Sequence, residues 1–396
     1  MKPLVSAEKP ISPGDKIQVM SSLPGALFKN ICLGISEPVL VSINLTNRCN
    51  QHCIYCEIGR GRLETEKPLL DCVDMEWILE EMENYRIPNL VLGGGEPLLF
   101  EGLLDILSSA GKRGLQTVVQ TNGMLIPHLR DGAWEVLKKS RASVAVSIDS
   151  FNPEIQNRVK GVPNAHHLQK RGIQLLVEHG IPVSLSTVIT SLNHADLSNL
   201  VEEAEVLGVR EVIFQPVIFS SNFPDTTPIP DKKGLNILPA QVEEIERRFD
   251  QILQFEKNHR VSTNLKVLRC WLPEYIQSLD QSGTGNPFFH KVLRRFWCAA
   301  LDLIISLNYY GEVLPCNLLK SSVNIKERGE KHLVDLWNQA CEPVRMNLRK
   351  GLYPDACASC ICNFSTNFLG STIRYPLHNF QHIPVVLASL TRYLHK

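Results

Sequence analysis

VLVSINLTNRCNQHCIYC, residues 39–56, joins a short β-branched run to three closely spaced cysteines, Cys49, Cys53 and Cys56. The run VLVSINL is typical of a buried β-strand. Three thiols do not complete a structural zinc site, which takes four ligands, or a disulfide framework, which takes an even number. Thiolates also bind iron–sulfur clusters, and a cluster of four irons on three cysteines leaves one iron open to a small molecule. The stretch therefore predicts a strand that ends in an open metal site.

The 396-residue chain has the composition of an ordinary globular protein, with 44% hydrophobic and 21% charged residues. Its 41 basic and 41 acidic residues balance, so no overall field favours nucleic acid or an acidic membrane. It has no apolar run near the roughly 20 residues that span a bilayer, and no signal-peptide core. We therefore expect a cytoplasmic protein whose cysteines serve metal or redox chemistry more readily than disulfides.

Strand-like runs alternate with helical stretches between residues 39 and 258. Strands are expected at 39–45, 89–94, 116–122, 143–149, 182–189 and 211–217, and helices at 75–85, 166–180, 197–208 and 239–257. This alternation is typical of a parallel sheet with crossover helices, mostly apolar on both faces. A doubly wound sheet and a partial (β/α)6 barrel both fit the pattern. In either fold, ligands bind at the carboxyl ends of the strands, where the cysteines, GGGEP, QTNG and SIDS all fall.

The spacing Cys49-x3-Cys53-x2-Cys56, directly after the first strand, resembles the signature of radical S-adenosylmethionine (radical SAM) enzymes. The resemblance covers about residues 39–258 and implies a partial (β/α)6 TIM-like barrel. It implies a 4Fe–4S cluster on the three cysteines, with S-adenosylmethionine (SAM) at the open iron. Such enzymes cleave SAM reductively to a 5′-deoxyadenosyl radical, which abstracts hydrogen from the substrate. A one-electron donor such as flavodoxin or ferredoxin is implied as a partner.

Two further motifs of the family match this sequence. Gly94, Gly95 and Glu96 are similar to the GGE element that holds the amino group of SAM. A carboxylate beside exposed backbone carbonyls suits an ammonium group. Ser147 and Asp149, in SIDS, resemble the element that contacts the ribose or carboxylate end of the cofactor.

Three single positions are also carried over from the family. Tyr55 stands where the backbone usually meets the adenine, and Gln215 is expected to approach the adenine from the sixth strand. Lys160 takes a place where relatives often carry arginine. Because a lysine cannot make a bidentate contact with a carboxylate, this position departs from the family's pattern.

A second cysteine group follows the barrel. Cys298 and Cys316 lie in a predicted β-hairpin, and Cys357 and Cys360 form a later CxxC. Four thiols complete a closed site, for which zinc and a 4Fe–4S cluster are equally plausible from the ligands alone. The pattern resembles the SPASM/twitch extension of radical SAM enzymes, which implies a second, auxiliary 4Fe–4S cluster that relays electrons. Cys362 is an alternative to Cys360 as the last ligand.

The predicted organisation has five segments. These are an N-terminal extension (1–38), the radical SAM partial barrel (39–258), a linker region (259–297), a small α+β auxiliary-cluster domain (298–365) and a basic amphipathic C-terminal tail (366–396). The tail is expected to dock on its own domain, with a weak membrane-surface contact as the alternative. The remaining cysteines, at positions 32, 72, 270 and 341, are expected to be buried, inert thiols.

The favoured function is oxidation or rearrangement at an unactivated carbon of a small-molecule substrate, with a sugar or lipid precursor preferred. One alternative is modification of a ribosomal peptide. Another, of a different class, is a non-catalytic scaffold whose cysteines bind zinc. No residue is assigned as the proton acceptor or as the group that holds the substrate.

Overall fold

The structure is a computed structural model, and it describes part of the chain. The described residues are 29–30, 34–58, 68–217, 233–279, 292, 297–357, 360, 367, 371–372, 377 and 379–384. The predictions for Cys32, for Cys362, for most of the N-terminal extension and for the tail beyond residue 384 lie outside the described residues.

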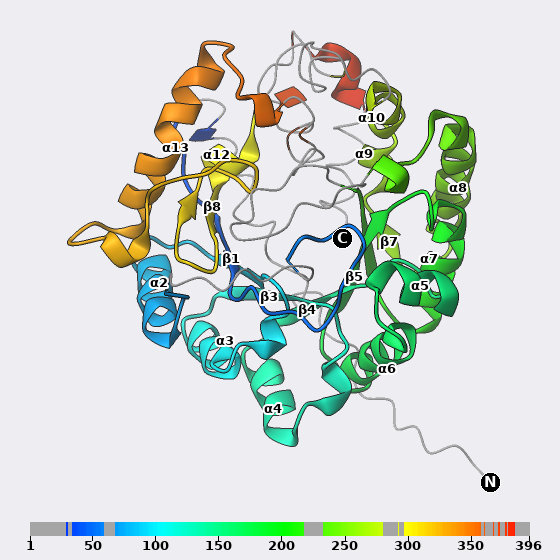
Figure 1. The fold of residues 1–396 in the computed structure, drawn as a ribbon, viewed down its shortest axis with the longest axis horizontal. Helices are drawn as coiled ribbons and strands as arrows, with labels where there is room; N and C mark the ends of the chain where they lie inside the picture. The colour runs from blue at the N-terminus through cyan, green and yellow to red at the C-terminus, as the bar shows by residue number, and fades with distance from the viewer. Residues whose placement is uncertain are drawn as a thin grey trace.

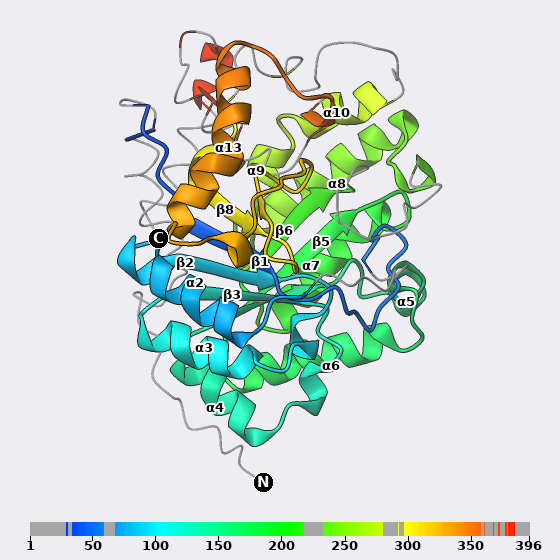
Figure 2. The ribbon, with the colours of Figure 1, turned by 60° about the vertical axis from the view of Figure 1, so that its left-hand side comes forward.

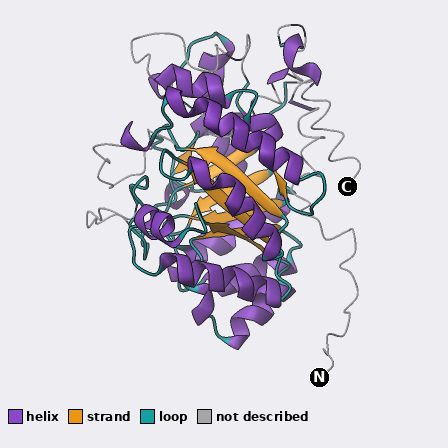
Figure 3. Cartoon of the chain, turned by 90° about the vertical axis from the view of Figure 1, so that its right-hand side faces the viewer, coloured by secondary structure: helices purple, strands orange, loops and turns teal. Residues whose placement is uncertain are grey.

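A twisted sheet forms the centre of the molecule, and helices surround it (Figures 1 and 3). Its strand order is β7-β6-β5-β4-β3-β2-β1-β8-β9, and neighbours are parallel except for the β8–β9 pair. The strands are β1 (Leu40–Asn44), β2 (Asn89–Gly93), β3 (Gln116–Thr121), β4 (Ser143–Ser147), β5 (Val183–Ile189), β6 (Glu211–Pro216), β7 (Ser262–Thr263), β8 (Ile304–Leu307) and β9 (Val313–Leu314). All six predicted strands are present in chain order, so the predicted partial TIM-like barrel is confirmed.

Crossover helices cover the outer face of the sheet (Figure 1). They are α2 (Cys72–Asn84), α3 (Leu103–Lys112), α4 (Asp131–Lys139), α5 (Pro153–Lys160), α6 (Ala165–Glu178), α7 (Leu197–Val206) and α8 (Val242–Phe255). Four more follow: α9 (Leu265–Leu268), α10 (Leu272–Leu279), α12 (Ala299–Leu303) and α13 (Leu333–Arg349). Within the described residues, no helix combines the length and apolar character needed to cross a membrane.

The first residue of α2 corrects one prediction. Asp71 caps this helix, because its carboxylate accepts the backbone N–H groups of Val73 and Asp74 at 2.9 Å each. The cap starts the helix at Cys72, three residues before the predicted range, and leaves Cys72 exposed. The prediction of a buried thiol at this position was therefore wrong, whereas Cys341 is buried as expected.

The two faces of the sheet differ in polarity. Val41 and Ile43 on β1 are fully buried in the hydrophobic cluster that joins the sheet to its helices. Ser42 and Asn44 point to the opposite face and are half-buried, and Gln120 on β3 is exposed. The expectation of strands apolar on both faces was wrong for these strands, because the inner face is only partly covered by other residues.

The C-terminal region extends the main sheet. The predicted hairpin is present as β8 and β9, and β8 pairs in parallel with β1, from Leu40 opposite Ile304 to Ile43 opposite Leu307. The short helix α12 precedes β8, and α13 packs against α12 and β9. Figure 2 shows α13 beside β8. The indole N–H of Trp337 on α13 donates to the Ile304 carbonyl at 2.9 Å. The second cysteine group thus lies beside β8 and β9, the two strands that extend the sheet beyond β1.

Candidate functional site

The segment after β1, residues 45–58, carries Cys49, Cys53 and Cys56 and is called the cysteine loop below. On one side it is held by the loop after β2. The Gly95 N–H donates to the Thr46 carbonyl and the Glu96 N–H donates to the Arg48 carbonyl, both at 2.7 Å. A Cβ atom on Gly95 would lie 2.1 Å from the Arg48 carbonyl oxygen, and Gly94 has a φ of +122°. Both glycines are therefore needed for the close approach of the two backbones.

The Glu96 side chain is fully buried beneath this contact. Its carboxylate accepts hydrogen bonds from the Thr121 hydroxyl at 2.7 Å, the Asn122 N–H at 2.7 Å and the Leu98 N–H at 3.1 Å. Burial raises the pKa of the Glu96 carboxyl, and these three hydrogen bonds oppose the rise. The carboxylate is thus used to join the loops after β2 and β3.

Asn122, from QTNG at the end of β3, contacts the cysteine loop directly. Its Nδ2 donates to the Asn50 side-chain oxygen at 2.6 Å and lies 3.8 Å from the Cys49 sulfur. Taken alone, this motif indicates only a turn, but its place at a strand end in register with the other three motifs predicts a position at the site. The contacts of Asn122 with the cysteine loop agree with that prediction.

On its other side, the cysteine loop is held by the end of α5. The His52 N–H donates to the Lys160 carbonyl at 3.1 Å, and the Ile54 N–H donates to the Val159 carbonyl at 3.0 Å. Gly161 ends the helix with a φ of +64°, and a Cβ atom there would lie 2.4 Å from the His52 carbonyl oxygen. The helix end and the loop can approach this closely only with glycine at position 161.

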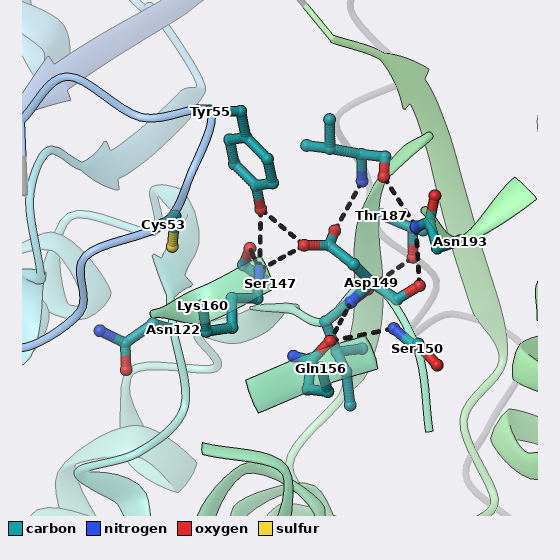
Figure 4. Close-up of polar contacts among 12 residues, drawn as sticks. Cys53, Tyr55, Asn122, Ser147, Asp149, Ser150, Gln156, Lys160, Thr187 and Asn193 are labelled. Atoms are coloured by element: carbon teal, nitrogen blue, oxygen red, sulfur yellow. Dashed lines mark hydrogen bonds and ion pairs between the residues drawn. The ribbon is translucent and has the colours of Figure 1, made fainter. Parts of the chain in front are cut away.

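A buried polar network lies below the same part of the loop (Figure 4). The Tyr55 hydroxyl donates to the Asp149 carboxylate at 2.7 Å. The Lys160 ammonium lies 2.8 Å from the same carboxylate oxygen, 2.9 Å from the Tyr55 hydroxyl and 3.0 Å from the Ser147 hydroxyl. The other Asp149 oxygen accepts the Val188 N–H at 2.8 Å. The structure therefore brings four of the predicted cofactor residues together, in contact with one another.

The titration of this network follows from its burial. The side chains of Lys160 and Asp149 are both 0% exposed. Burial lowers the pKa of Lys160, but the Asp149 carboxylate and the neighbouring thiols outweigh it, and the net shift is upward. Burial and the Asp149 carboxylate raise the pKa of the Tyr55 phenol well above its usual value. The Lys160 ammonium is therefore charged, and the Tyr55 phenol is neutral, at physiological pH.

Amide side chains form a second layer around the network. The Gln156 side-chain oxygen accepts the N–H groups of Asp149 and Ser150 at 3.0 Å each, and Asn193 donates to the Asp149 carbonyl at 2.8 Å. Gln169 donates to the Asn122 carbonyl at 2.6 Å. Sequence reasoning missed these glutamines and this asparagine, because a buried amide has no periodic signal that separates it from a surface residue.

The thiols of the cysteine loop are half-buried neighbours. Burial raises the pKa of Cys53 to about 12, with the Lys160 ammonium opposing the rise, and burial also raises the pKa of Cys49. Metal ligation needs the deprotonated thiolates, which burial disfavours. The positive charge of a bound metal would stabilise these thiolates. Among the described residues, no three Cys, His, Asp or Glu side chains are placed to share one metal ion. A four-iron cluster binds each thiolate at a different iron, which spreads the ligands further apart.

The second cysteine group lines one pocket. Cys298 caps α12, Cys316 follows β9, and Cys357 and Cys360 come from the segment after α13. The rest of the lining is apolar: Ala300, Leu301, Leu318, Leu319, Val344 and Leu348. Burial raises the pKa of Cys316 to about 11 and that of Cys357 to about 12. We call this the auxiliary pocket. Of the ten described cysteines, none forms a disulfide.

Gln215 is exposed near the end of β6, in register with Val188 on β5. Its described contacts include no hydrogen bond to the cysteine loop. Gln215 therefore lies on the strand beside the network around Asp149 and not within it.

A sheet with three cysteines at the end of β1, and four more in a pocket at its edge, is the arrangement that the resemblance to radical SAM enzymes implies. Residues 43–204 match the sequence profile of the Radical SAM superfamily. The match makes residues 43–204 similar to this superfamily, and the proteins similar to the chain include enzymes of the SPASM type. The radical SAM family uses a 4Fe–4S cluster and SAM, and SPASM-type relatives carry auxiliary clusters as well.

Two relatives and one solved structure illustrate the similarity. The chain is 24% identical to the PqqA peptide cyclase of Granulibacter bethesdensis, over 82% of this chain and 80% of the relative. It is also 24% identical to the AdoMet-dependent heme synthase of Methanosarcina barkeri, over 82% of this chain and 91% of the relative. The crystal structure of Streptococcus suis SuiB bound to precursor peptide SuiA shares the fold, with a TM-score of 0.59 at 16% identity. That match covers 87% of this chain and 75% of SuiB.

Proposed function

We propose that Cys49, Cys53 and Cys56 bind a 4Fe–4S cluster whose fourth iron takes SAM, and that the chain uses this pair to oxidise a substrate. The supporting observation is the division of seven cysteines into an open set of three and a closed set of four. When bound, the cluster and SAM supply a 5′-deoxyadenosyl radical that removes a hydrogen atom from carbon. The protein's part is to fix the cysteine loop and to orient cofactor and substrate.

The cofactor contacts are assigned to the rim of the cysteine loop. The backbone at Gly94 and Gly95 is proposed to receive the amino group of SAM, and the backbone at Tyr55 and the side chain of Gln215 its adenine. The Glu96 carboxylate supports this arrangement from below, because its oxygens already accept three hydrogen bonds within the protein. Ser147 is proposed to face the ribose or carboxylate end.

The auxiliary pocket is proposed to hold a second 4Fe–4S cluster on Cys298, Cys316, Cys357 and Cys360. A fully ligated cluster has no open iron for a substrate, so its use is electron transfer. It would accept the electron left on the substrate after hydrogen abstraction. The substrate radical would lose this electron together with a proton, which passes to solvent, so the substrate loses two hydrogen atoms in total, the first of them to the 5′-deoxyadenosyl radical. The electron that starts the reaction is supplied by a flavodoxin or ferredoxin in the cytoplasm.

The relatives change the substrate expected from the sequence. They give no support to a sugar or lipid precursor. The PqqA peptide cyclase and the peptide-bound SuiB structure favour a peptide, which we propose as the substrate class. The heme synthase relative favours a tetrapyrrole as the second candidate, since the chain covers 91% of that enzyme.

Iron and sulfide counts per chain test the cluster assignment. After anaerobic reconstitution, about eight irons are expected per chain. Changing Cys49, Cys53 and Cys56 together to alanine should leave about four, and changing the four pocket cysteines to alanine should leave the other four. Cys72→Ser is the matched control, because Cys72 is exposed at the start of α2, and it should keep the full count. A wild-type count of about four that falls to zero in the first variant would remove the auxiliary cluster and the oxidation.

Mass spectrometry separates the substrate candidates. The loaded enzyme is incubated with SAM, a reductant and either candidate peptides or porphyrin precursors. A peptide that loses about 2 Da, the mass of two hydrogens, supports the proposal. Turnover of the porphyrin precursors without turnover of any peptide would show that the substrate is a tetrapyrrole and not a peptide.

A further inference from the structure

We propose that the side chains of Tyr55, Ser147, Asp149 and Lys160, called the loop anchor below, position the cysteine loop, and that Lys160 is not a ligand of SAM. The inference rests on the proposed cluster site and gives its buried network a role. It also departs from the sequence prediction, which placed Lys160 against the cofactor.

The hydrogen-bonding capacity of Lys160 is already filled. An ammonium group has three N–H donors. In this structure it has three acceptors, the Asp149 carboxylate, the Tyr55 hydroxyl and the Ser147 hydroxyl, at 2.8 to 3.0 Å. Its side chain is 0% exposed. A carboxylate from SAM would have to displace one of these partners and open a buried ion pair.

Lys160 holds the loop on both sides of the middle cysteine. Its backbone carbonyl accepts the His52 N–H, and its ammonium donates to the Tyr55 hydroxyl. Cys53 lies between these two attachment points in the sequence. One residue of α5 therefore holds the loop on either side of Cys53, through one main-chain and one side-chain contact.

The loop anchor is itself fixed to the sheet. One Asp149 oxygen accepts the Val188 N–H of β5, and the Asp149 carbonyl accepts a hydrogen bond from Asn193. Because Asp149 follows β4, the anchor connects two strands, α5 and the cysteine loop. A buried ion pair adds little net stability, but its geometry is strict, which suits a positioning role. Lysine fits this role because its three donors diverge from one point, whereas the donors of arginine lie in a plane.

The test compares cluster retention with SAM affinity in the full-length holoenzyme. Tyr55→Phe removes one hydroxyl and preserves the ring, and Lys160→Met removes the charge and keeps a similar length. Lys170→Met is the matched control, since Lys170 pairs with Glu203 at 2.9 Å on the half-exposed surface. Only a cluster with an open iron changes its EPR spectrum when SAM is added. This SAM-responsive signal is followed in two ways, as its rate of loss under a chelator and as its titration with SAM.

Both anchor variants should lose the SAM-responsive signal at least about tenfold faster than wild type and Lys170→Met, because Tyr55→Phe removes two buried hydrogen bonds and Lys160→Met removes three, one of them to the Asp149 carboxylate. The SAM concentration for half-saturation of the remaining signal should stay within about twofold, because no cofactor contact is removed. Weaker SAM binding in Lys160→Met, restored in Lys160→Arg and with unchanged cluster retention, would overturn the inference and make Lys160 a cofactor ligand. Unchanged values for both variants would also overturn it. A wild-type enzyme without any SAM-responsive signal would overturn the proposed function itself.

Discussion

Replacing Gly161 by alanine is expected to displace the cysteine loop. Its cost in unfolding free energy has two parts, one from the backbone conformation and one from the contact of the new Cβ atom with the loop. Gly161 has a φ of +64°, and a left-handed conformation costs alanine roughly 1–2 kcal/mol. The new Cβ atom would also lie 2.4 Å from the His52 carbonyl oxygen, so the loop must move by about 1 Å to restore ordinary contact. Overpacking of this kind costs about 1–3 kcal/mol.

Gly180 is the matched control, because it has a φ of +70° and open space where a Cβ atom would be placed. Gly180→Ala should therefore cost only the roughly 1–2 kcal/mol of the backbone conformation. Gly161→Ala should cost about 1–3 kcal/mol more, from the contact with the loop. Urea denaturation under anaerobic conditions measures both, and iron per chain is measured on the same samples.

The two glycines separate backbone strain from damage to the site. Gly161→Ala should lower the iron content by removing the cluster of the cysteine loop, while Gly180→Ala should keep the wild-type count. Equal losses of stability in both variants, with equal iron, would refute the argument that the end of α5 shapes the cysteine loop.

Three further changes have defined outcomes. Gly95→Ala places a Cβ atom 2.1 Å from a loop carbonyl and should lower iron per chain, whereas Gly132→Ala, in open space on α4, should keep the iron and raise stability by about 0.5–1 kcal/mol. Arg345→Met removes two hydrogen bonds, from the guanidinium Nη2 at 2.6 Å and Nε at 2.9 Å, to the carbonyl of Leu301, a residue that lines the auxiliary pocket. It should cost about 1–3 kcal/mol in urea denaturation and bring iron from about eight toward four, with the SAM-responsive EPR signal kept. Asp71→Ala removes the cap of α2 and should cost about 1 kcal/mol without any change in iron, and a fall in iron would contradict the separation of α2 from both sites.

The strands, and the meeting of the site motifs at their ends, could be predicted from the sequence because each is a local signal. Every strand of the barrel is a short β-branched run that ends in turn residues, so alternation alone placed six of them in chain order. The cysteines are equally local, since their spacing is independent of what surrounds them. Spacing alone does not assign Cys298 and Cys357 to one site, because they are far apart in the sequence. The resemblance to the SPASM/twitch extension groups them, and they line the same pocket in the structure.

Contacts between distant segments could not be predicted in the same way. The pairing of β8 with β1 joins Ile304 to Leu40, and neither strand carries a mark that selects the other. The same limit applies to Gln156 and Gln169, whose amides are buried only because several segments meet around them. Cys72 is a different case. The sequence DCVD contains the signal of a helix cap at Asp71, and that signal places Cys72 in the first turn of a helix.

The two cysteine sites are held in place by different kinds of contact, hydrogen bonds around the cysteine loop and apolar packing around the auxiliary pocket. The cysteine loop receives backbone hydrogen bonds from the loop after β2 and from the end of α5, and side-chain bonds from Asn122 and Lys160. These contacts come from groups of the protein other than the three thiols. The auxiliary pocket is lined by apolar side chains, and two of its thiols, Cys357 and Cys360, lie beyond the last long helix. For the proposed cluster with an open iron, the missing fourth thiolate leaves the protein to supply the rigidity that a fully ligated cluster gains from its own ligands, and the hydrogen bonds of the cysteine loop are suited to supply it.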